Sequence, residues 1–293
     1  MKILVTGANG QVGHCLQQQL QNSGMDFVAL ARADLDISDA QAVENAVQQI
    51  QPDVIINAAA YTAVDKAEQE QALAFAINRD GAANLAHAAK KIDAAILHIS
   101  TDYVFAGDAT GIYSEDASTT PQGVYGQSKL EGEQAVIAAN DKHIILRTAW
   151  VFGEHGNNFV KTMIRLGRTR DALGIVADQE GGPTYAGDIA KTLITIAQQY
   201  AARKPIAWGT YHYSGLPHIS WFGFARHIFT EVEKAKLYEK AIPQLNAITT
   251  ADYPTPAKRP ANSKLDCNKI ELAFGVAASD WQLALKNINA YSA

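Results

Sequence analysis

A tyrosine and a lysine four residues apart, Tyr125 and Lys129, are the residues of this sequence best placed for acid–base chemistry. If the segment is helical, both side chains project from one face, so that a phenol lies beside an ammonium group. A nearby cation stabilises the phenolate and lowers a pKa that starts near ~10, which suits a proton donor. The same spacing also fits an amphipathic helix that buries the ring and extends the lysine to solvent. Only further motifs can separate these two interpretations.

A glycine-rich turn follows the first apolar run of the chain, with Gly7, Gly10 and Gly13 at regular spacing. Open α/β sheets bind dinucleotides at such a turn, because the next helix offers unpaired N–H groups and partial positive charge to the phosphates. Gly7 would permit the turn, Gly10 a close approach of the backbone to pyrophosphate, and Gly13 close helix packing. A purely structural turn is the alternative. The residues expected to contact the cofactor here are Gly7, Asn9, Gly10, Gln11 and Val12.

The elements expected around these motifs alternate between short apolar strands and longer helices. Strands are predicted at residues 3–6, 27–31, 54–57, 95–99 and 144–147, and helices at 11–23, 39–50, 72–91 and 125–140. Ser38 is expected to cap the second helix. Continuous apolar strands separated by helices predict an α/β fold with a doubly wound, Rossmann-like parallel sheet.

The second half of the chain is richer in glycine, proline and aromatic residues. We expect residues 1–150 to form the dinucleotide-binding domain and residues 151–293 to form mainly a smaller, loop-rich substrate-binding lobe. Some later segments, such as residues 209–213, are expected to return to the sheet. The boundary between the two parts is therefore open.

The composition argues for an ordinary soluble enzyme. Hydrophobic residues make up 47% of the 293 positions and charged residues 19%, which is unlike a disordered chain. A net charge of -5 argues against nucleic acid or an anionic membrane as a partner. The two cysteines, Cys15 and Cys267, form no metal or disulfide motif, and the eight histidines show no ligand spacing. Without a recognisable signal peptide or membrane-spanning run, we expect a cytoplasmic protein.

The end of the second predicted strand bears on the choice between NADPH and NADH. It carries Arg32 between two alanines and no carboxylate that could bind a ribose 2′-hydroxyl. Arg32 could pair with a 2′-phosphate, which favours NADPH, whereas a solvated surface arginine is the alternative interpretation. Use of NADH therefore stays open.

Two further segments are expected beside the cofactor. Asp36 and Ile37 fit a short strand, and the Asp36 carboxylate would accept a hydrogen bond from the adenine amine. Ala60, Tyr61 and Thr62 follow the next strand and would pass along the cofactor.

Several longer motifs resemble one family. The Gly-x-x-Gly-x-x-Gly turn and the Tyr-x-x-x-Lys pair with Ser100 and Thr101 upstream resemble the extended short-chain dehydrogenase/reductase superfamily. Segments 57–68, 100–105, 157–163, 178–184 and 259–263 resemble the dTDP-4-dehydrorhamnose reductase family itself, in one order over nearly the whole chain. The resemblance implies a reductase that uses NAD(P)H to convert a dTDP-linked 4-keto-6-deoxysugar, dTDP-4-dehydro-L-rhamnose, into dTDP-L-rhamnose.

The same resemblance implies catalytic roles for Thr101, Tyr125 and Lys129. Tyr125 would give a proton to the developing alkoxide while hydride passes from nicotinamide to the sugar C4. Lys129 would bind the nicotinamide ribose and bring the tyrosine pKa closer to working pH. Thr101 would hydrogen-bond the keto oxygen. Its alternative is a threonine that caps the following turn.

The residues expected at the substrate are Thr101, Asp102, Tyr125, Trp150, Asn158 and Arg259. Asp102 would lie near the sugar hydroxyls. Trp150 would form an apolar wall, unless it serves only core packing. Arg259 is the best candidate for the substrate pyrophosphate, because a guanidinium fork fits phosphate oxygens. Asn78 would either support the catalytic network through water or satisfy helix backbone.

Other functions remain to be weighed against this one. A noncatalytic NADP-binding regulatory subunit has the same fold but no need of Thr101, Tyr125 and Lys129. An epimerase or dehydratase for another nucleotide sugar is a second alternative, although a dehydratase would carry an acidic pair where this chain has Asp102 followed by Tyr103. Some members of the family use Mg²⁺ at a subunit contact, and no such site is visible here. The protein could be a monomer or a homodimer.

Overall fold

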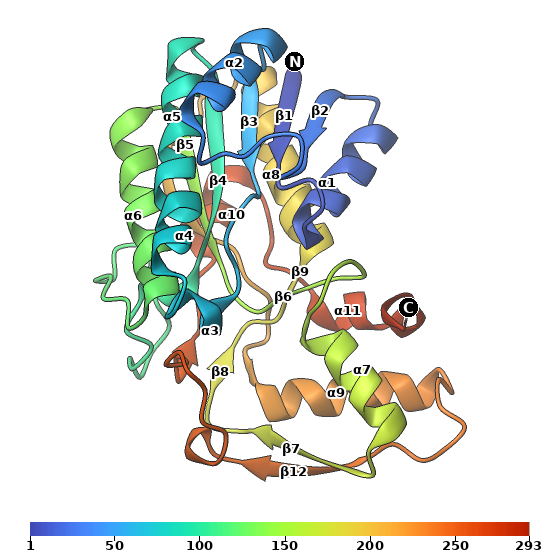
Figure 1. The fold of residues 1–293 in the computed structure, drawn as a ribbon. Coiled ribbons are helices and arrows are strands. Elements are labelled where there is room, and N and C mark those ends of the chain that lie inside the picture. Colours follow the sequence, from blue (N-terminus) through green and yellow to red (C-terminus); the bar gives the residue numbers. More distant parts are fainter. Residues whose placement is uncertain (293) are drawn as a thin grey trace.

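Six parallel strands form the main sheet of the computed structural model, which describes residues 1–292 (Figure 1). Their order across the sheet is β10-β5-β4-β3-β1-β2. The strands are β1 (Lys2–Thr6), β2 (Asp26–Leu30), β3 (Val54–Asn57), β4 (Ala95–Thr101), β5 (His143–Thr148) and β10 (Gly209–His212). The doubly wound parallel sheet predicted from the sequence is confirmed.

Helices cover both faces of this sheet because its strands are apolar on both sides. In β1, Ile3 and Val5 belong to one core cluster, whereas Leu4 belongs to the other. The first face carries α1 (Gln11–Asn22), α8 (Ala186–Ala201) and α10 (Asn268–Phe274). The second carries α2 (Ala40–Ile50), α5 (Ala82–Lys91) and α6 (Val124–Ala139) (Figure 1).

The strand order reverses at β1, which lies between β2 and β3. The chain passes from β1 through α1 to the edge strand β2 and then crosses to β3 on the other side. A reversal of this kind opens a crevice at the carboxyl ends of the strands, where ligands of such sheets bind. Close packing at this point requires a glycine, because a Cβ on Gly13 would lie 2.2 Å from the Gly7 carbonyl oxygen.

The predicted helix over residues 72–91 is divided into three parts. It consists of α4 (Gln71–Phe75), a π-helical segment η1 (Ala76–Gly81) and α5. The wider turn holds buried Asn78, whose Oδ1 accepts from the Tyr61 backbone N–H at 2.8 Å. Its Nδ2 donates to the Tyr61 carbonyl and to the Ser128 hydroxyl. Asn78 thus fixes the backbone after β3, rather than its own helix.

Two local predictions near α2 are wrong. The residue that caps the helix is Asp39 and not Ser38: Asp39 Oδ1 accepts from the backbone N–H groups of Gln41 and Ala42, both at 3.0 Å. Asp36 and Ile37 form no strand either. The Asp36 carboxylate accepts from both the backbone N–H and the hydroxyl of Ser38, which turns the chain and prevents an extended conformation.

The smaller lobe lies below the carboxyl ends of the main sheet (Figure 1). Its core contains large aromatic side chains, among them Phe152, Phe224 and Trp281. Its helices are α7 (Phe159–Thr169), α9 (Trp221–Lys234) and α11 (Trp281–Leu285). Its strand pairs are β7 (Ala172–Val176) with β12 (Gln244–Ile248), β6 (Val151–Phe152) with β9 (Thr184–Tyr185), and β8 (Glu180–Gly181) with both β11 (Ile219–Ser220) and β13 (Asn262–Ser263).

The chain crosses between the two parts more than once. Strand β10 pairs with β5, so the predicted return of residues 209–213 to the sheet is confirmed. Helix α8 also lies beyond residue 150 and packs on α1. A division at residue 150 stays a prediction. The remaining short elements are α3 (Val64–Ala67), η2 (Asp102–Val104), η3 (Thr250–Asp252) and η4 (Ile288–Tyr291). None of the helices within residues 1–292 combines the length and the apolar character needed to cross a bilayer.

A buried ion pair fastens α6 to the sheet. Glu133 of α6 accepts from the Arg147 guanidinium of β5 through both carboxylate oxygens, with the shortest contact at 2.7 Å. Ser100 of β4 donates to the same carboxylate at 2.5 Å. Because each charge has its partner, the pair can be buried without leaving a charge uncompensated. Helix α6, which carries Tyr125 and Lys129, is thereby held in a fixed position on the face of the sheet.

Candidate active site

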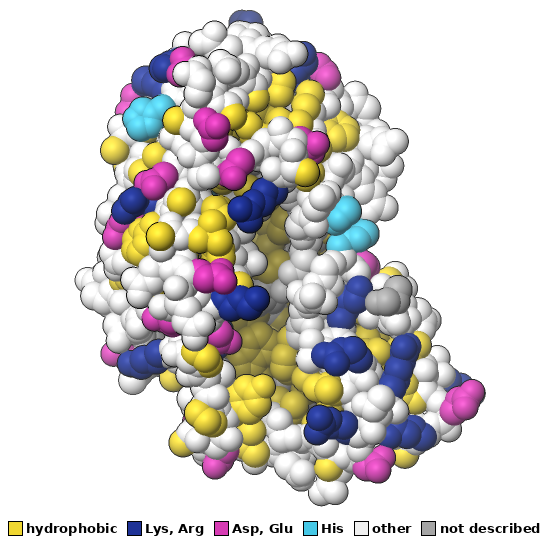
Figure 2. All heavy atoms as spheres, viewed as in Figure 1, with side chains coloured by type: hydrophobic (Ala, Val, Ile, Leu, Met, Phe, Trp, Pro, Cys, Tyr) yellow, Lys and Arg dark blue, Asp and Glu magenta, His cyan; other side chains and the backbone are white. Residues whose placement is uncertain are grey.

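A cavity of ≈ 850 Å³ opens at the carboxyl ends of the central strands, where the main sheet meets the lobe. Figure 2 shows this face hollowed between the two parts, with apolar side chains on its floor. Most residues predicted from the sequence lie in its wall: Gly7, Asn9, Gly10, Gln11, Val12, Arg32, Asp36, Ile37, Ala60, Tyr61, Thr62, Thr101, Asp102, Tyr125, Lys129 and Trp150. One cavity therefore unites the cofactor and catalytic predictions.

The glycine-rich turn presents unpaired backbone donors to the cavity. Gly7 has a φ of 76°, a conformation that favours glycine. Helix α1 begins at Gln11, and its N-cap residue, Gly10, has no side chain that could satisfy the first N–H groups. Free N–H groups at a helix start form a site for phosphate. The arrangement fits a dinucleotide pyrophosphate.

The end of β2 carries a cation toward the same cavity. Arg32 is exposed and lines the wall. The nearby Asp34 carboxylate turns back to accept from the Ala31 backbone N–H at 2.9 Å. Hydrogen bonds from Ser38 hold the pKa of Asp36 below its ordinary value. Arg32 is thus the cation available at this end of the cavity for a phosphate group.

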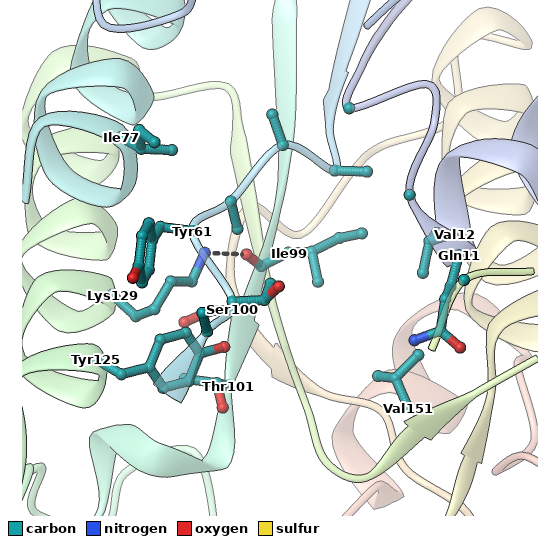
Figure 3. Close-up of a pocket in the computed structure, with 18 of the residues that line it drawn as sticks. Gln11, Val12, Tyr61, Ile77, Ile99, Ser100, Thr101, Tyr125, Lys129 and Val151 are labelled. Carbon is teal, nitrogen blue, oxygen red and sulfur yellow. Dashed lines mark hydrogen bonds between the residues drawn. The ribbon is translucent and has the colours of Figure 1, made fainter. Parts of the chain in front are cut away.

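Tyr125, Thr101 and Lys129 meet on the floor of the cavity (Figure 3). Burial raises the pKa of the Tyr125 phenol, and the nearby Thr101 hydroxyl offsets part of this rise. The sequence predicted that Lys129 lowers this pKa, but the pKa shifts upward and Lys129 is not among its causes. Desolvation prevails over the expected effect of the cation. The phenol is therefore protonated at neutral pH, as a proton donor must be, although a raised pKa also makes it a weaker acid.

The Lys129 ammonium group is turned to the sheet. It donates to the Ile99 carbonyl at 2.7 Å, drawn as a dashed line in Figure 3, and lies 3.3 Å from His98 Nε2. The side chain is buried, and burial lowers its pKa to about 8, with Glu133 acting weakly in the opposite direction. A lysine with this pKa can exchange its proton near neutral pH.

Asp102 connects the site to the lobe. Its Oδ2 accepts from the Ser263 hydroxyl of β13 at 2.5 Å, and its Oδ1 accepts from Thr101 at 3.0 Å. Burial raises the pKa of Asp102 to about 6, although both hydrogen bonds oppose the shift. The carboxyl group is therefore fixed between Thr101 and a strand from far along the chain.

Trp150 lies both in the cavity wall and in the aromatic packing of the lobe. Its ring lines the cavity and also stacks on Trp221, with centroids 3.5 Å apart and an interplanar angle of 9°. Its backbone has a φ of 50°, which is unusual for a bulky residue. Gly181 makes room for the ring, because a Cβ there would lie 2.6 Å from Trp150 Cε2. The packing holds the indole as a rigid apolar wall.

Asn158 and Arg259 lie outside the cavity wall. Asn158 caps α7, since its Oδ1 accepts from the Lys161 backbone N–H and its Nδ2 donates to Gln11 and to the Gly153 carbonyl. The Arg259 guanidinium donates to Asp65 at 2.5 Å and to the Tyr103 hydroxyl at 3.0 Å. Their contacts with substrate stay predictions.

Other residues of the wall were missed by the sequence analysis. They include Tyr103, Thr148, Gly156 and Asn157. Tyr103 and Thr148 lie at or just after the ends of strands, and Gly156 and Asn157 precede Asn158. These positions were the available signal. Thr148 pairs in register with Thr101, and its buried hydroxyl has no hydrogen-bond partner within residues 1–292. Over the same residues, no three His, Cys, Asp or Glu side chains are grouped so as to hold a metal ion.

Comparisons with known proteins agree over the full length. Residues 1–292 match the family model described as RmlD substrate binding domain. The chain is similar to a dTDP-4-dehydrorhamnose reductase of Aggregatibacter actinomycetemcomitans, with 52% identity over 99% of both chains. Among solved structures, it resembles a dTDP-4-dehydrorhamnose reductase from Clostridium acetobutylicum, with a TM-score of 0.91, 42% identity and 99% and 98% coverage. The Bacillus anthracis enzyme in complex with NADP has a TM-score of 0.90, 38% identity and 98% coverage of each chain.

The buried lysine yields a prediction about stability and pH. The folded pKa of Lys129 is about 8, whereas an unfolded lysine has a pKa near ~10.4. Between these values the unfolded chain binds more protons, so stability must rise with pH. We predict that wild type gains about 2–3 kcal/mol in free energy of unfolding relative to Lys129→Met from pH 7 to pH 10. Urea unfolding at several pH values measures this, and parallel curves for the two proteins would contradict it.

Proposed function

This chain belongs to the RmlD substrate binding domain family, and from that membership we propose that it uses NADPH to reduce the 4-keto group of dTDP-4-dehydro-L-rhamnose, giving dTDP-L-rhamnose. The observation that carries the proposal is the meeting of Thr101, Tyr125 and Lys129 beside the glycine-rich turn in one cavity. A regulatory subunit that only binds NADP would not need this group. An epimerase or dehydratase stays the second alternative.

The cavity fits the dinucleotide by shape and by chemistry. Gly7 and Gly10 line the cavity at the start of α1, where no side chain caps the first N–H groups and pyrophosphate would bind, whereas Gly13 lets the helix pack closely on the turn. Ala60, Tyr61 and the other residues after β3 line the path from there to Lys129. When bound, the nicotinamide supplies the hydride for the sugar C4.

Tyr125 is proposed as the proton donor. As C4 gains hydride, the keto oxygen becomes an alkoxide, and the O–H bond of the phenol breaks while a new O–H bond forms on the sugar. A phenol that is neutral at working pH is ready for this step. The Thr101 hydroxyl would donate to the same oxygen and stabilise the developing charge. Lys129 would hold the nicotinamide ribose.

The sugar would lie between Trp150 and Asp102. The stacked indole offers an apolar face to the deoxygenated side of the sugar. The Asp102 carboxyl, anchored by Ser263, would accept from a sugar hydroxyl. Arg259 would bind the substrate pyrophosphate, supported by Asp65 and Tyr103, which fix the direction of its fork.

We predict that Tyr125→Phe retains NADPH binding and loses most of its turnover. The change removes the hydroxyl but keeps the ring that packs edge-on against Tyr103. Loss of a general acid costs typically ~10²–10⁴-fold in rate. The test follows NADPH oxidation with dTDP-4-dehydro-L-rhamnose, and measures NADPH affinity separately by fluorescence. A variant with near-wild-type kcat would reject Tyr125 as the donor, whereas an inactive wild type would reject the proposed substrate.

Arg32→Ala should distinguish NADPH from NADH. If the guanidinium pairs with the 2′-phosphate, the change raises the KM for NADPH about tenfold or more and leaves that for NADH nearly unchanged. Arg203→Ala is the matched control, because Arg203 is also exposed but lies outside the cavity wall. Equal effects of Arg32→Ala on both dinucleotides would make Arg32 an ordinary surface residue.

Arg259→Met should raise the KM for the nucleotide sugar by roughly one to two decades, because a charge-assisted contact worth about 1.5–3 kcal/mol is lost. NADPH binding and the fold should be kept. The comparison is Lys258→Met, which removes an exposed charge one residue away. Should Lys258→Met have the larger effect in a calorimetric titration with the nucleotide sugar, the phosphate contact belongs to Lys258.

A further inference from the structure

A row of buried polar side chains crosses three strands just beneath the cavity. The strand register places Thr6 of β1 beside Asn57 of β3, and Asn57 beside His98 of β4. All three are buried, and His98 approaches Lys129 of α6. The preceding side chains on the same face of these strands, Leu4, Ile55 and Ile96, are apolar and buried, so the row marks the point where this hydrophobic face becomes polar. Such a row must satisfy its hydrogen bonds internally.

The orientation of the Asn57 amide is determined by its neighbours. Its Oδ1 lies 2.8 Å from Thr6 Oγ1 and 3.1 Å from the Ala59 backbone nitrogen. A backbone N–H can only donate, so the atom facing Ala59 must be the amide oxygen. The Asn57 NH₂ group therefore faces His98 Nδ1, at 2.9 Å.

This contact determines the tautomer of His98. Because the Asn57 NH₂ group donates, His98 Nδ1 must accept and can carry no proton. In an imidazolium, the Nδ1–H of His98 would point at the N–H of the Asn57 amide. The doubly protonated ring is therefore disfavoured by geometry as well as by burial. The pKa of His98 is indeed held well below its ordinary value, first by burial and then by Lys129. The neutral ring carries its proton on Nε2.

The proton on Nε2 points to Lys129, whose Nζ lies 3.3 Å away. An ammonium group has three donors and no acceptor, whereas a neutral amine has a lone pair that could accept this N–H. The Ile99 carbonyl takes one N–H of the lysine in either state. Only the neutral amine satisfies both neighbours at once.

Other charged or titratable groups around Lys129 do not remove this conflict. Glu133, one turn further along α6, is the anion that favours the ammonium form, but its charge is already shared with Arg147 of β5. The hydroxyl of Tyr61, from the segment after β3, donates a hydrogen bond to Glu70. Tyr125, on the same helix, is partly buried, and desolvation raises its pKa, so its phenol is neutral.

We infer that His98 is a positioning residue which, locked by Asn57 with its proton on Nε2, disfavours the ammonium form of Lys129 and holds the amine against the Ile99 carbonyl. Thr6 lies at the end of β1, immediately before the glycine-rich turn, so the row joins the proposed phosphate site to the catalytic lysine. The inference rests on the proposed role of Lys129 in cofactor binding. His98 does not itself line the cavity.

The tautomer can be observed directly in the wild-type protein. Two-bond ¹H–¹⁵N spectra of ¹⁵N-histidine-labelled protein distinguish a protonated ring nitrogen from an unprotonated one. The His98 signal is the one absent from His98→Gln. We expect a neutral ring with its proton on Nε2 that does not titrate between about pH 5 and 9. A proton on Nδ1, or protonation of the ring within this range, would overturn the inference. NADPH is not needed for this measurement.

A double-mutant cycle tests the effect on Lys129. In Asn57→Asp the new carboxylate accepts instead of donating, so the proton of His98 moves to Nδ1 and Nε2 becomes an acceptor for the ammonium. The pKa of Lys129, followed by the ¹³Cε shift of ¹³C-lysine, should rise by about one unit or more. The same substitution made with His98→Gln reports the effect of the added charge alone. We expect less than half the shift there.

An equal shift of the Lys129 pKa with His98 and with His98→Gln would show that His98 does not act on Lys129. This result would overturn the inference even if the tautomer were as expected. NADPH titrations of the same proteins add the functional readout: the pH above which affinity falls should move upward in Asn57→Asp by the same amount as the lysine pKa. A wild type that binds no NADPH would refute the proposed function and leave the tautomer and lysine measurements valid.

Discussion

The active site depends on the requirement that polar groups buried at the carboxyl ends of β1, β3 and β4 find partners inside the protein. Parallel strands in register place Thr6, Asn57 and His98 side by side, and Ser100 further along β4 beside Arg147. Hydrogen bonds offset the cost of burying each side chain and also fix its orientation. Helix α6 supplies Glu133 as the partner of Ser100 and Lys129 as the partner of His98. The geometry of the site therefore depends on the position of α6 on the sheet.

Glycines allow α6 to reach that position. A Cβ on Gly126 would lie 2.2 Å from the Tyr103 carbonyl oxygen, and one on Gly132 would lie 2.1 Å from the Asn78 carbonyl oxygen. Both obstacles are backbone atoms, which cannot move aside as a flexible side chain could. The helix is therefore drawn against η1 and η2 by small residues and fastened by the Glu133 ion pair. A lysine on such a helix cannot avoid desolvation, which accounts for the direction of its pKa shift.

The sequence was sufficient to predict the sheet and to single out the glycine-rich turn, Tyr125 and Lys129, which line one cavity, because strand periodicity and motif spacing are local properties. It was insufficient where long-range contacts decide. Whether Lys129 or burial governs the pKa of Tyr125 depends on depth, which spacing does not reveal. Asp39 and Ser38 are both residue types that cap helices well, and only the residue at which α2 begins decides which of them is the cap. Asn158 caps α7 through the nearby Lys161 backbone N–H, but its second contact, with Gln11, joins residues 147 positions apart and is not visible in local sequence.

Among the contacts that link the lobe to this centre are polar ones from the last third of the chain. Ser263 reaches Asp102, and Arg259 reaches both Asp65 and Tyr103. Asp102 and Tyr103 directly follow Thr101 in the sequence, so a movement of the lobe would change the surroundings of Thr101, where the keto oxygen is proposed to bind. The Arg259–Asp65 ion pair is partly exposed, so water or a phosphate group can compete for the guanidinium, whereas the Ser263–Asp102 contact is buried. If Arg259 binds the substrate pyrophosphate as proposed, the nucleotide end of the substrate would act on a residue that also contacts Tyr103, two residues from Thr101.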